Sequence, residues 1–143
     1  MRNRILGTEE VVRRVTVVKD ALGLKACMLT PTKPVNEEYL PCIFIQESVD
    51  EVTKTSARTR VGYPMKRSLE LNIEIVADRN ATKPIYDLYR EVRSAVFADD
   101  NPVVADGGTF IQEIRTEGPT GYGLPDVVGM TLVLTLFYTD EGN

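Results

Sequence analysis

The stretch RSLELNIEIVADRNATKPIYDLYREVRSAVFAD, residues 67–99, joins a pattern of period two to a helical pattern. In its first half, apolar and polar residues alternate as they do in a strand with one buried and one solvated face. These apolar residues are Leu69, Leu71, Ile73 and Ile75. In its second half, the apolar residues recur three and four positions apart, as on an amphipathic helix. They are Ile85, Leu88, Tyr89, Val92 and Val96. The stretch therefore predicts a strand near 69–77 that leads into a helix near 84–97.

Apolar patterns elsewhere extend this unit into a sheet with a second helix. Valines at helical spacing predict a helix near 9–22, which Gly23 ends. Further strands are predicted near 42–47, 109–117 and 129–139. Because the strands follow one another mostly without helical crossovers, we expect one α+β domain over residues 1–143. It would be a mainly antiparallel β-sheet with two helices packed on one face and a projecting β-hairpin arm.

Several finer predictions accompany this fold. Thr8 is the expected N-cap of the first helix, and Thr82, two residues before Pro84, is that of the second. The segment 28–41 contains three prolines and predicts an irregular crossing. The expected core includes Leu71, Ile73, Leu88, Val92 and Leu134.

The composition argues against most classes of enzyme. The 143 residues include no histidine and no tryptophan, so the commonest general base and imidazole metal ligand are missing. No pair of carboxylates stands out for acid–base catalysis, and Cys27 and Cys42 lack a C-x-x-C spacing and are interpreted as reduced core residues. No apolar run approaches the roughly 20 residues of a membrane span, and no secretory signal is recognised. We therefore expect a cytoplasmic, non-enzymatic protein without cofactor, metal or membrane.

Charge is distributed unevenly along the chain. Residues 1–67 carry 12 Lys and Arg against 8 Asp and Glu, a net +4, whereas residues 68–143 carry 5 against 13, a net −8. The segment 52–67, VTKTSARTRVGYPMKR, has no acid and predicts a projecting hairpin arm or a long loop. Its basic residues are Lys54, Arg58, Arg60, Lys66 and Arg67. With a sequence pI near 4.9, specific nucleic-acid binding is not expected. A solvated edge, or contact with an acidic neighbour or a second copy, fits better.

The glycine-rich segment 118–129, GPTGYGLPDVVG, resembles a phosphate-binding loop in composition only. Such a loop needs a following helix whose N-terminus faces the anion. Here a β pattern follows, no G-K-[ST] is present, and the surrounding half of the chain is acidic. The segment is therefore interpreted as a long hairpin connection with Tyr122 and Leu124 at its tip. It is either a solvent-exposed loop or a binding loop that orders when a partner docks.

The order of these elements resembles the tail-terminator, or tail-completion, proteins of long-tailed bacteriophages, the family of minor tail protein U. The resemblance covers most of the chain and is one of pattern, without a catalytic motif. The matching segments are TEEVVRRVTVVKDAL, PCIFIQES, RSLELNIEIVA, KPIYDLYREVRSAVF, FIQEIRTEG and GMTLVLTLFYTDE. The proline-rich segment 30–40 and the acidic turn 99–106 depart from the family pattern.

The resemblance implies a structural virion protein in the tail and neck region, assembled in the host cytoplasm. It implies a ring, typically six-fold, that caps the tail tube, ends tube polymerisation and joins the tail to the head connector. The implied partners are copies of itself, the tail-tube protein, the connector and, in a contractile tail, the sheath. We expect the basic arm and the Tyr122–Leu124 loop to contact a neighbouring subunit or the tube. The alternatives are another neck component, such as a head-completion or connector protein, and a small soluble enzyme.

Overall fold

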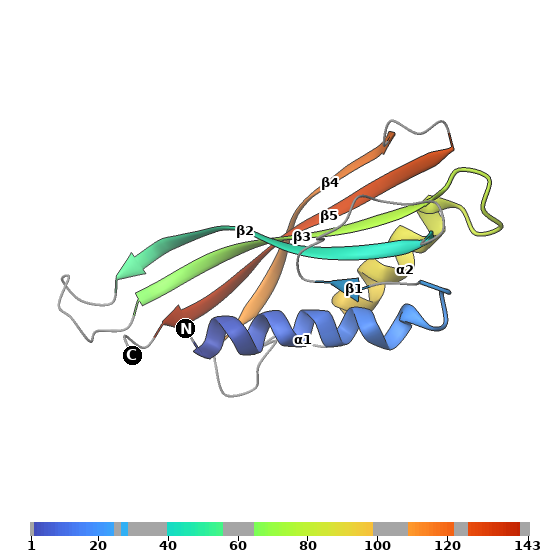
Figure 1. The fold of residues 1–143 in the computed structure, drawn as a ribbon. Helices are drawn as coiled ribbons and strands as arrows, with labels where there is room; N and C mark the ends of the chain where they lie inside the picture. The colour runs from blue at the N-terminus through green and yellow to red at the C-terminus, as the bar shows by residue number, and fades with distance from the viewer. Residues whose placement is uncertain are drawn as a thin grey trace.

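The computed structural model describes residues 2–24, 27–28, 40–55, 65–98, 109–121 and 126–140, and its elements form one sheet with two helices (Figure 1). The helices and strands are α1 (Arg2–Lys19), β1 (Cys27–Met28), β2 (Cys42–Thr55), β3 (Met65–Asp78), α2 (Ile85–Val96), β4 (Phe110–Gly121) and β5 (Val127–Asp140). The strand order is β1-β2-β3-β5-β4, in which β1 pairs with β2 in parallel and the other neighbours are antiparallel. The predicted α+β class with a mainly antiparallel sheet is confirmed.

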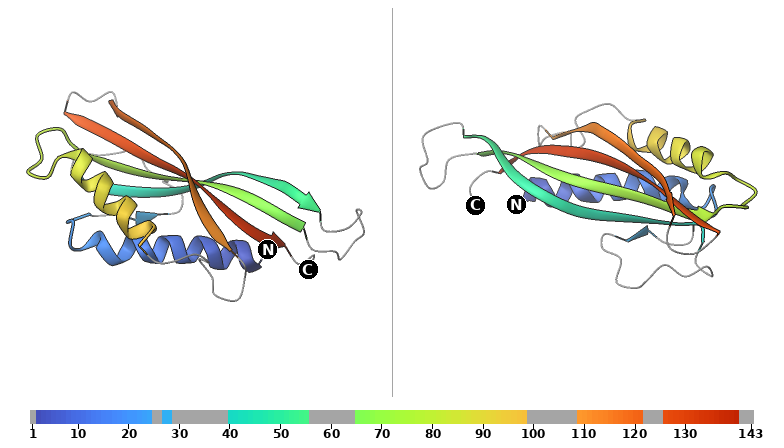
Figure 2. Two further views of the ribbon diagram at one scale, coloured as in Figure 1. Left: turned by 180° about the vertical axis from the view of Figure 1, so that it is seen from behind. Right: turned by 90° about the horizontal axis from the view of Figure 1, so that it is seen from above.

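β3 and β5 form the centre of the sheet. They pair from Met65↔Asp140 to Asp78↔Val127 without a register shift, so Leu71 lies opposite Leu134. The alternate residues of both strands face the same side and form one core with α1 and α2, and Figure 2 shows this arrangement from two further directions. The five predicted core residues, Leu71, Ile73, Leu88, Val92 and Leu134, are all buried, which confirms that prediction.

The first helix begins at Arg2 rather than near residue 9, and Thr8 is not its N-cap. Thr8 lies inside the helix with 3% of its surface exposed, and its hydroxyl donates a hydrogen bond to Glu47. Gly7 lies so close to β5 that an added Cβ would be 2.7 Å from the Leu136 side chain. Contacts with the sheet therefore extend the helix toward its N-terminus, beyond the point that local capping signals indicate.

α2 begins after Pro84, so the predicted cap Thr82 lies two residues before the observed N-cap. Pro84 is the N-cap, with extended backbone and no side-chain capping bond. At the other end of α2, the Arg14 guanidinium donates a hydrogen bond to the Val96 carbonyl at 2.8 Å. Only 4% of Arg14 is exposed. A cation at the C-terminus of a helix is favoured by the helix dipole, so this buried arginine joins the two helices.

The antiparallel pair of β2 and β3 confirms the base of the predicted arm. β2 continues to Thr55, well beyond the predicted end at residue 47, and pairs with β3 as far as Thr55↔Met65. All views show β2 and β3 extending past the start of α1 (Figures 1 and 2). The tip, residues 56–64, lies outside the described residues. Most of the predicted crossing 28–41 is also outside them, and the short strand β1 was not predicted.

The loop within the glycine-rich segment is shorter than the sequence predicts. β4 continues to Gly121 and β5 begins at Val127, with Thr120 paired to Gly129. A register shift between Glu117 and Thr120 accommodates Gly118, whose φ is +96°. The prediction of a long loop from residue 118 was therefore wrong, because glycine and proline occupy a bulge of an edge strand here rather than a connection.

We predict that Leu71→Ala and Leu134→Ala each lower the free energy of unfolding by about 2–5 kcal/mol. Both side chains are fully buried on facing strands, so truncation leaves a cavity. Denaturant titration measures the change, and Val17→Ala serves as the control. Val17 is 66% exposed, and its truncation should change stability by less than about 0.5 kcal/mol. Losses at both leucines as small as at Val17 would contradict the assignment.

A second prediction concerns Gly118. A Cβ at this position would be 2.6 Å from the Gly129 carbonyl oxygen, and the positive φ is unfavourable for other residues. Gly118→Ala should therefore cost about 1–3 kcal/mol in denaturant titration. Gly121→Ala is the matched control, since its Cβ would meet nothing within 4 Å. Equal effects of the two substitutions would show that the bulge does not require glycine.

Candidate functional site: a polar network at the base of the arm

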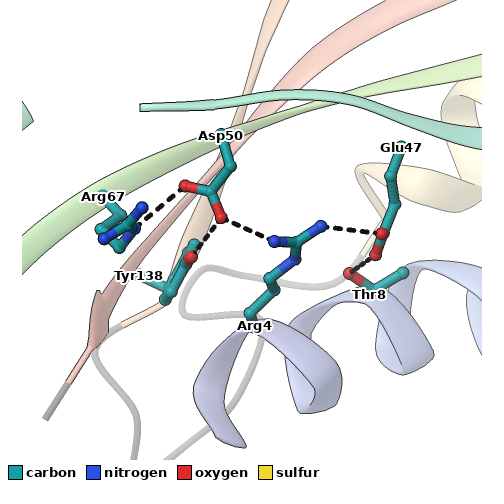
Figure 3. A network of polar contacts seen from close by, with 6 residues as sticks. All are labelled: Arg4, Thr8, Glu47, Asp50, Arg67 and Tyr138. Atoms are coloured by element: carbon teal, nitrogen blue, oxygen red, sulfur yellow. Dashed lines mark hydrogen bonds and ion pairs between the residues drawn. The ribbon is translucent and has the colours of Figure 1, made fainter. Parts of the chain in front are cut away.

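The base of the arm is tied to the rest of the molecule by a bulge in β2. The register shifts between Glu47, which lies opposite Leu71, and Asp50, which lies opposite Leu69. Because both partners belong to the helix-covered face, the shift places both carboxylates on the side of α1. Figure 3 shows Arg4 of α1 lying between them. The bulge therefore puts two acids where one helical arginine can bind both.

Asp50 is the centre of this network. Its carboxylate accepts hydrogen bonds from Arg4 Nη1 at 3.0 Å, Arg67 Nε at 3.2 Å and the Tyr138 hydroxyl at 2.5 Å. These donors come from α1, β3 and β5, and the Asp50 side chain is only 12% exposed. Charge-assisted hydrogen bonds from several donors offset part of the free energy that desolvation of a carboxylate costs. Asp50 thereby fixes the arm to three other elements.

Glu47 completes the network on the helix side. Its carboxylate accepts from Arg4 Nη2 at 2.9 Å and from the Thr8 hydroxyl at 3.3 Å (Figure 3). Burial and the bond to Asp50 raise the pKa of Tyr138 to about 12, so its hydroxyl stays a donor at neutral pH. The carboxylates of Glu47 and Asp50 each accept a hydrogen bond from at least one guanidinium. The arrangement holds structural elements in place and presents no reactive group.

The structure describes only some of the residues of the predicted interface. Arg67 belongs to the network, whereas Lys66 points to the opposite face of the sheet and is exposed. Lys54 lies on β2, with its side chain not described. Arg58, Arg60, Tyr122 and Leu124 lie outside the described residues.

The two predicted contact regions lie at opposite ends of the sheet. The arm leaves the sheet where Met65 pairs with Asp140. The connection that contains Tyr122 and Leu124 follows Gly121, which pairs with Val128 near the other end of β3. The 14 residues of β3 span roughly 45 Å at the usual strand rise.

Sequence reasoning missed most of the network. Arg4, Glu47, Asp50 and Tyr138 were not singled out, and Thr8 was interpreted as a helix cap, because the proximity of these residues depends on the bulge and on the docking of α1. Two signals were present. Arg4 and Thr8 are four residues apart, on one face of a helix. Asp50 and Glu51 are the two acids that directly precede the basic segment 52–67.

The described residues contain no group of three or more Cys, Asp and Glu that could hold a metal ion. Within the same ranges, no helix has the length and apolar character needed to cross a membrane.

Comparisons with known proteins show a likeness at the level of the fold. No model of a protein family and no curated protein match the chain. Among solved structures, the chain is similar to a component of the structure described as "Virion of native gene transfer agent (GTA) particle". The TM-score is 0.59 with 13% identity, over 91% of this chain and 92% of that one. At this identity the likeness establishes a shared fold across nearly the whole chain.

The network predicts a pH dependence of stability. The folded protein holds the Tyr138 proton more tightly than the unfolded chain, whose tyrosine pKa is near 10. The corresponding stability, up to about 3 kcal/mol, is present below pH 10 and lost as the pH rises toward 12. Urea titration at pH 9 and pH 11.5 should show a larger decrease for wild type than for Tyr138→Phe. Equal decreases would contradict the raised pKa of Tyr138.

Proposed function

We propose that this chain is a structural protein of a phage-like virion that forms a ring on the upper end of the tail tube. The ring would end tube polymerisation and provide the surface that joins the tail to the head. The observation that carries the proposal is the shared fold, over 91% of the chain, with a component of a gene transfer agent virion. The order of elements described above, which resembles tail terminators, gives the more specific role.

The geometry suits a subunit that assembles head to tail. A rigid body carries the basic arm at one end of its sheet and the Tyr122–Leu124 connection at the other. Two different surfaces on one subunit generate a heterologous contact, which closes into a ring when the rotation permits. The proposed ring is six-fold, located in the virion neck, with the tail-tube protein and the head connector as partners. A sheath would be a further partner if the tail is contractile.

In this proposal the arm and the connection supply the interface. Lys54, Arg58, Arg60 and Lys66 meet acidic groups of a neighbouring subunit or of the tube. Arg67, whose guanidinium is bound to Asp50 at 3.2 Å, contributes by holding the base of the arm. Tyr122 and Leu124 supply an apolar contact at the other end. The role requires no catalysis, which agrees with a sequence that lacks histidine.

We predict that Arg58→Glu combined with Arg60→Glu leaves the monomer folded and weakens the ring. An exposed pair contributes only ~0–1 kcal/mol, but a ring repeats each contact and multiplies the loss. Thermal melting, oligomer mass and tail length are measured on the same variants, and tails are expected to be overlong or unjoined. Arg13→Glu with Arg90→Glu is the matched control, since these exposed arginines pair within α1 and α2.

If the variant with Arg58→Glu and Arg60→Glu keeps its rings and its normal tail lengths, the arm is only a solvated edge. That result would contradict the proposed interface. Binding of the purified ring to tail tubes identifies a terminator. Binding only to proteins on the portal side would instead identify a head-completion or connector protein.

A further inference from the structure

The face of the sheet opposite the helices carries a hollow of about 110 Å³. Such a volume is several times the roughly 10–15 Å³ that one water requires. The lining residues, here called the acidic hollow, are Phe44, Gln46, Asn72, Glu74, Glu117 and Thr131. Thr131 pairs with Glu74 on one side and Glu117 on the other. The two carboxylates therefore flank Thr131, with their Cα atoms two strand spacings, roughly 9–10 Å, apart.

The acidic hollow contains a buried hydrogen-bond acceptor that no described residue satisfies. The Oδ1 atom of Asn72 is buried and has no hydrogen-bond partner. Buried polar atoms are nearly always paired in folded proteins, so an orphan acceptor requires an explanation. Glu74, beside it on β3, forms no ion pair with any residue that the structure describes. A donor with positive charge would satisfy both groups.

The described charged residues around the acidic hollow leave it negative. Arg115 binds Glu117 at 2.7 Å and lies 3.8 Å from Glu70, which partly neutralises those two acids. Arg115 is one cation against three acids, including Glu74. The charge of Glu74 acts on its surroundings: burial, and then this carboxylate, raise the pKa of the Cys42 thiol to about 11. Complementarity therefore favours a basic group.

We propose that the acidic hollow binds an arginine side chain from the arm, residues 54–60, of a second copy of this chain. The guanidinium offers five donors in a planar fork, which suits two carboxylates and an amide oxygen. The inference rests on the proposed function and names the surface that receives the arm. The segment 54–60 lies within the acid-free stretch 52–67 and contains two arginines at alternate positions, Arg58 and Arg60.

The chain's own arm does not reach the acidic hollow. From Met65, where the arm leaves the sheet, Glu74 is nine residues along β3, roughly 30 Å away. Arg60 is five residues from either Thr55 or Met65, and five residues of extended backbone span at most about 18 Å. Arg58 is closer still to Thr55. The occupant must therefore come from another copy.

The test measures self-association by sedimentation velocity for variants on both sides of the contact. Glu74→Lys should weaken association at least about ten-fold, as the loss of a desolvated charge pair does. Adding Arg58→Glu and Arg60→Glu to Glu74→Lys should restore association, because the reversed charges again attract. Glu9→Lys is the control, since this exposed carboxylate on α1 lies far from the acidic hollow.

Asn72→Leu separates binding from folding. Removing an unsatisfied buried acceptor should keep or raise the melting temperature of the monomer, while association is weakened because the arginine loses a partner. If the arm reversal dissociates the oligomer but Glu74→Lys and Asn72→Leu do not, the arm docks elsewhere and this inference is wrong, while the proposed function stands. If neither side of the contact affects association, the arm is not an interface and this inference is wrong; the proposed function is then decided by whether the purified protein forms rings that bind tail tubes.

Discussion

The pairing of β3 with β5 is the constraint on which the rest of the molecule depends. The two strands stay in register from Met65↔Asp140 to Asp78↔Val127. Since side chains alternate between faces, this register places Leu71 and Leu134 on the side of the helices and Asn72 on the other. A slip of one residue would exchange the two faces. The core, the polar network and the acidic hollow would then all be lost together.

The features that depend on side-chain period could be predicted from the sequence. The strand and helix in residues 67–99 and the burial of Leu71 and Leu134 follow from hydrophobic spacing, which reports a face directly. The bulge before Asp50, the bulge at Gly118 and the start of α1 at Arg2 could not be predicted. They arise from contacts between distant segments, which override local capping and turn signals. The polar network depends on the bulge before Asp50 and on the docking of α1. It was missed for that reason.

The arm is held at its base before any partner arrives. Asp50 binds Arg4, Arg67 and Tyr138, so the orientation of the hairpin is coupled to α1 and β5 (Figure 3). A contact made by a preorganised element loses less conformational entropy on binding than one made by a free loop. The negative surface that would receive the arm lies on the other face of the same sheet, out of its own reach. In the proposed interface, these two features would favour association between copies over closure within one chain.

The unbroken pairing of β3 with β5 also determines how the arm can change in evolution. Adding two residues to each strand beyond Thr55 and Met65 would lengthen the hairpin by about 7 Å and return every side chain to its original face. A single added residue would invert the tip, exchanging its inward and outward side chains. The reach of the subunit can therefore vary in steps of two residues per strand, with the folded body unaltered.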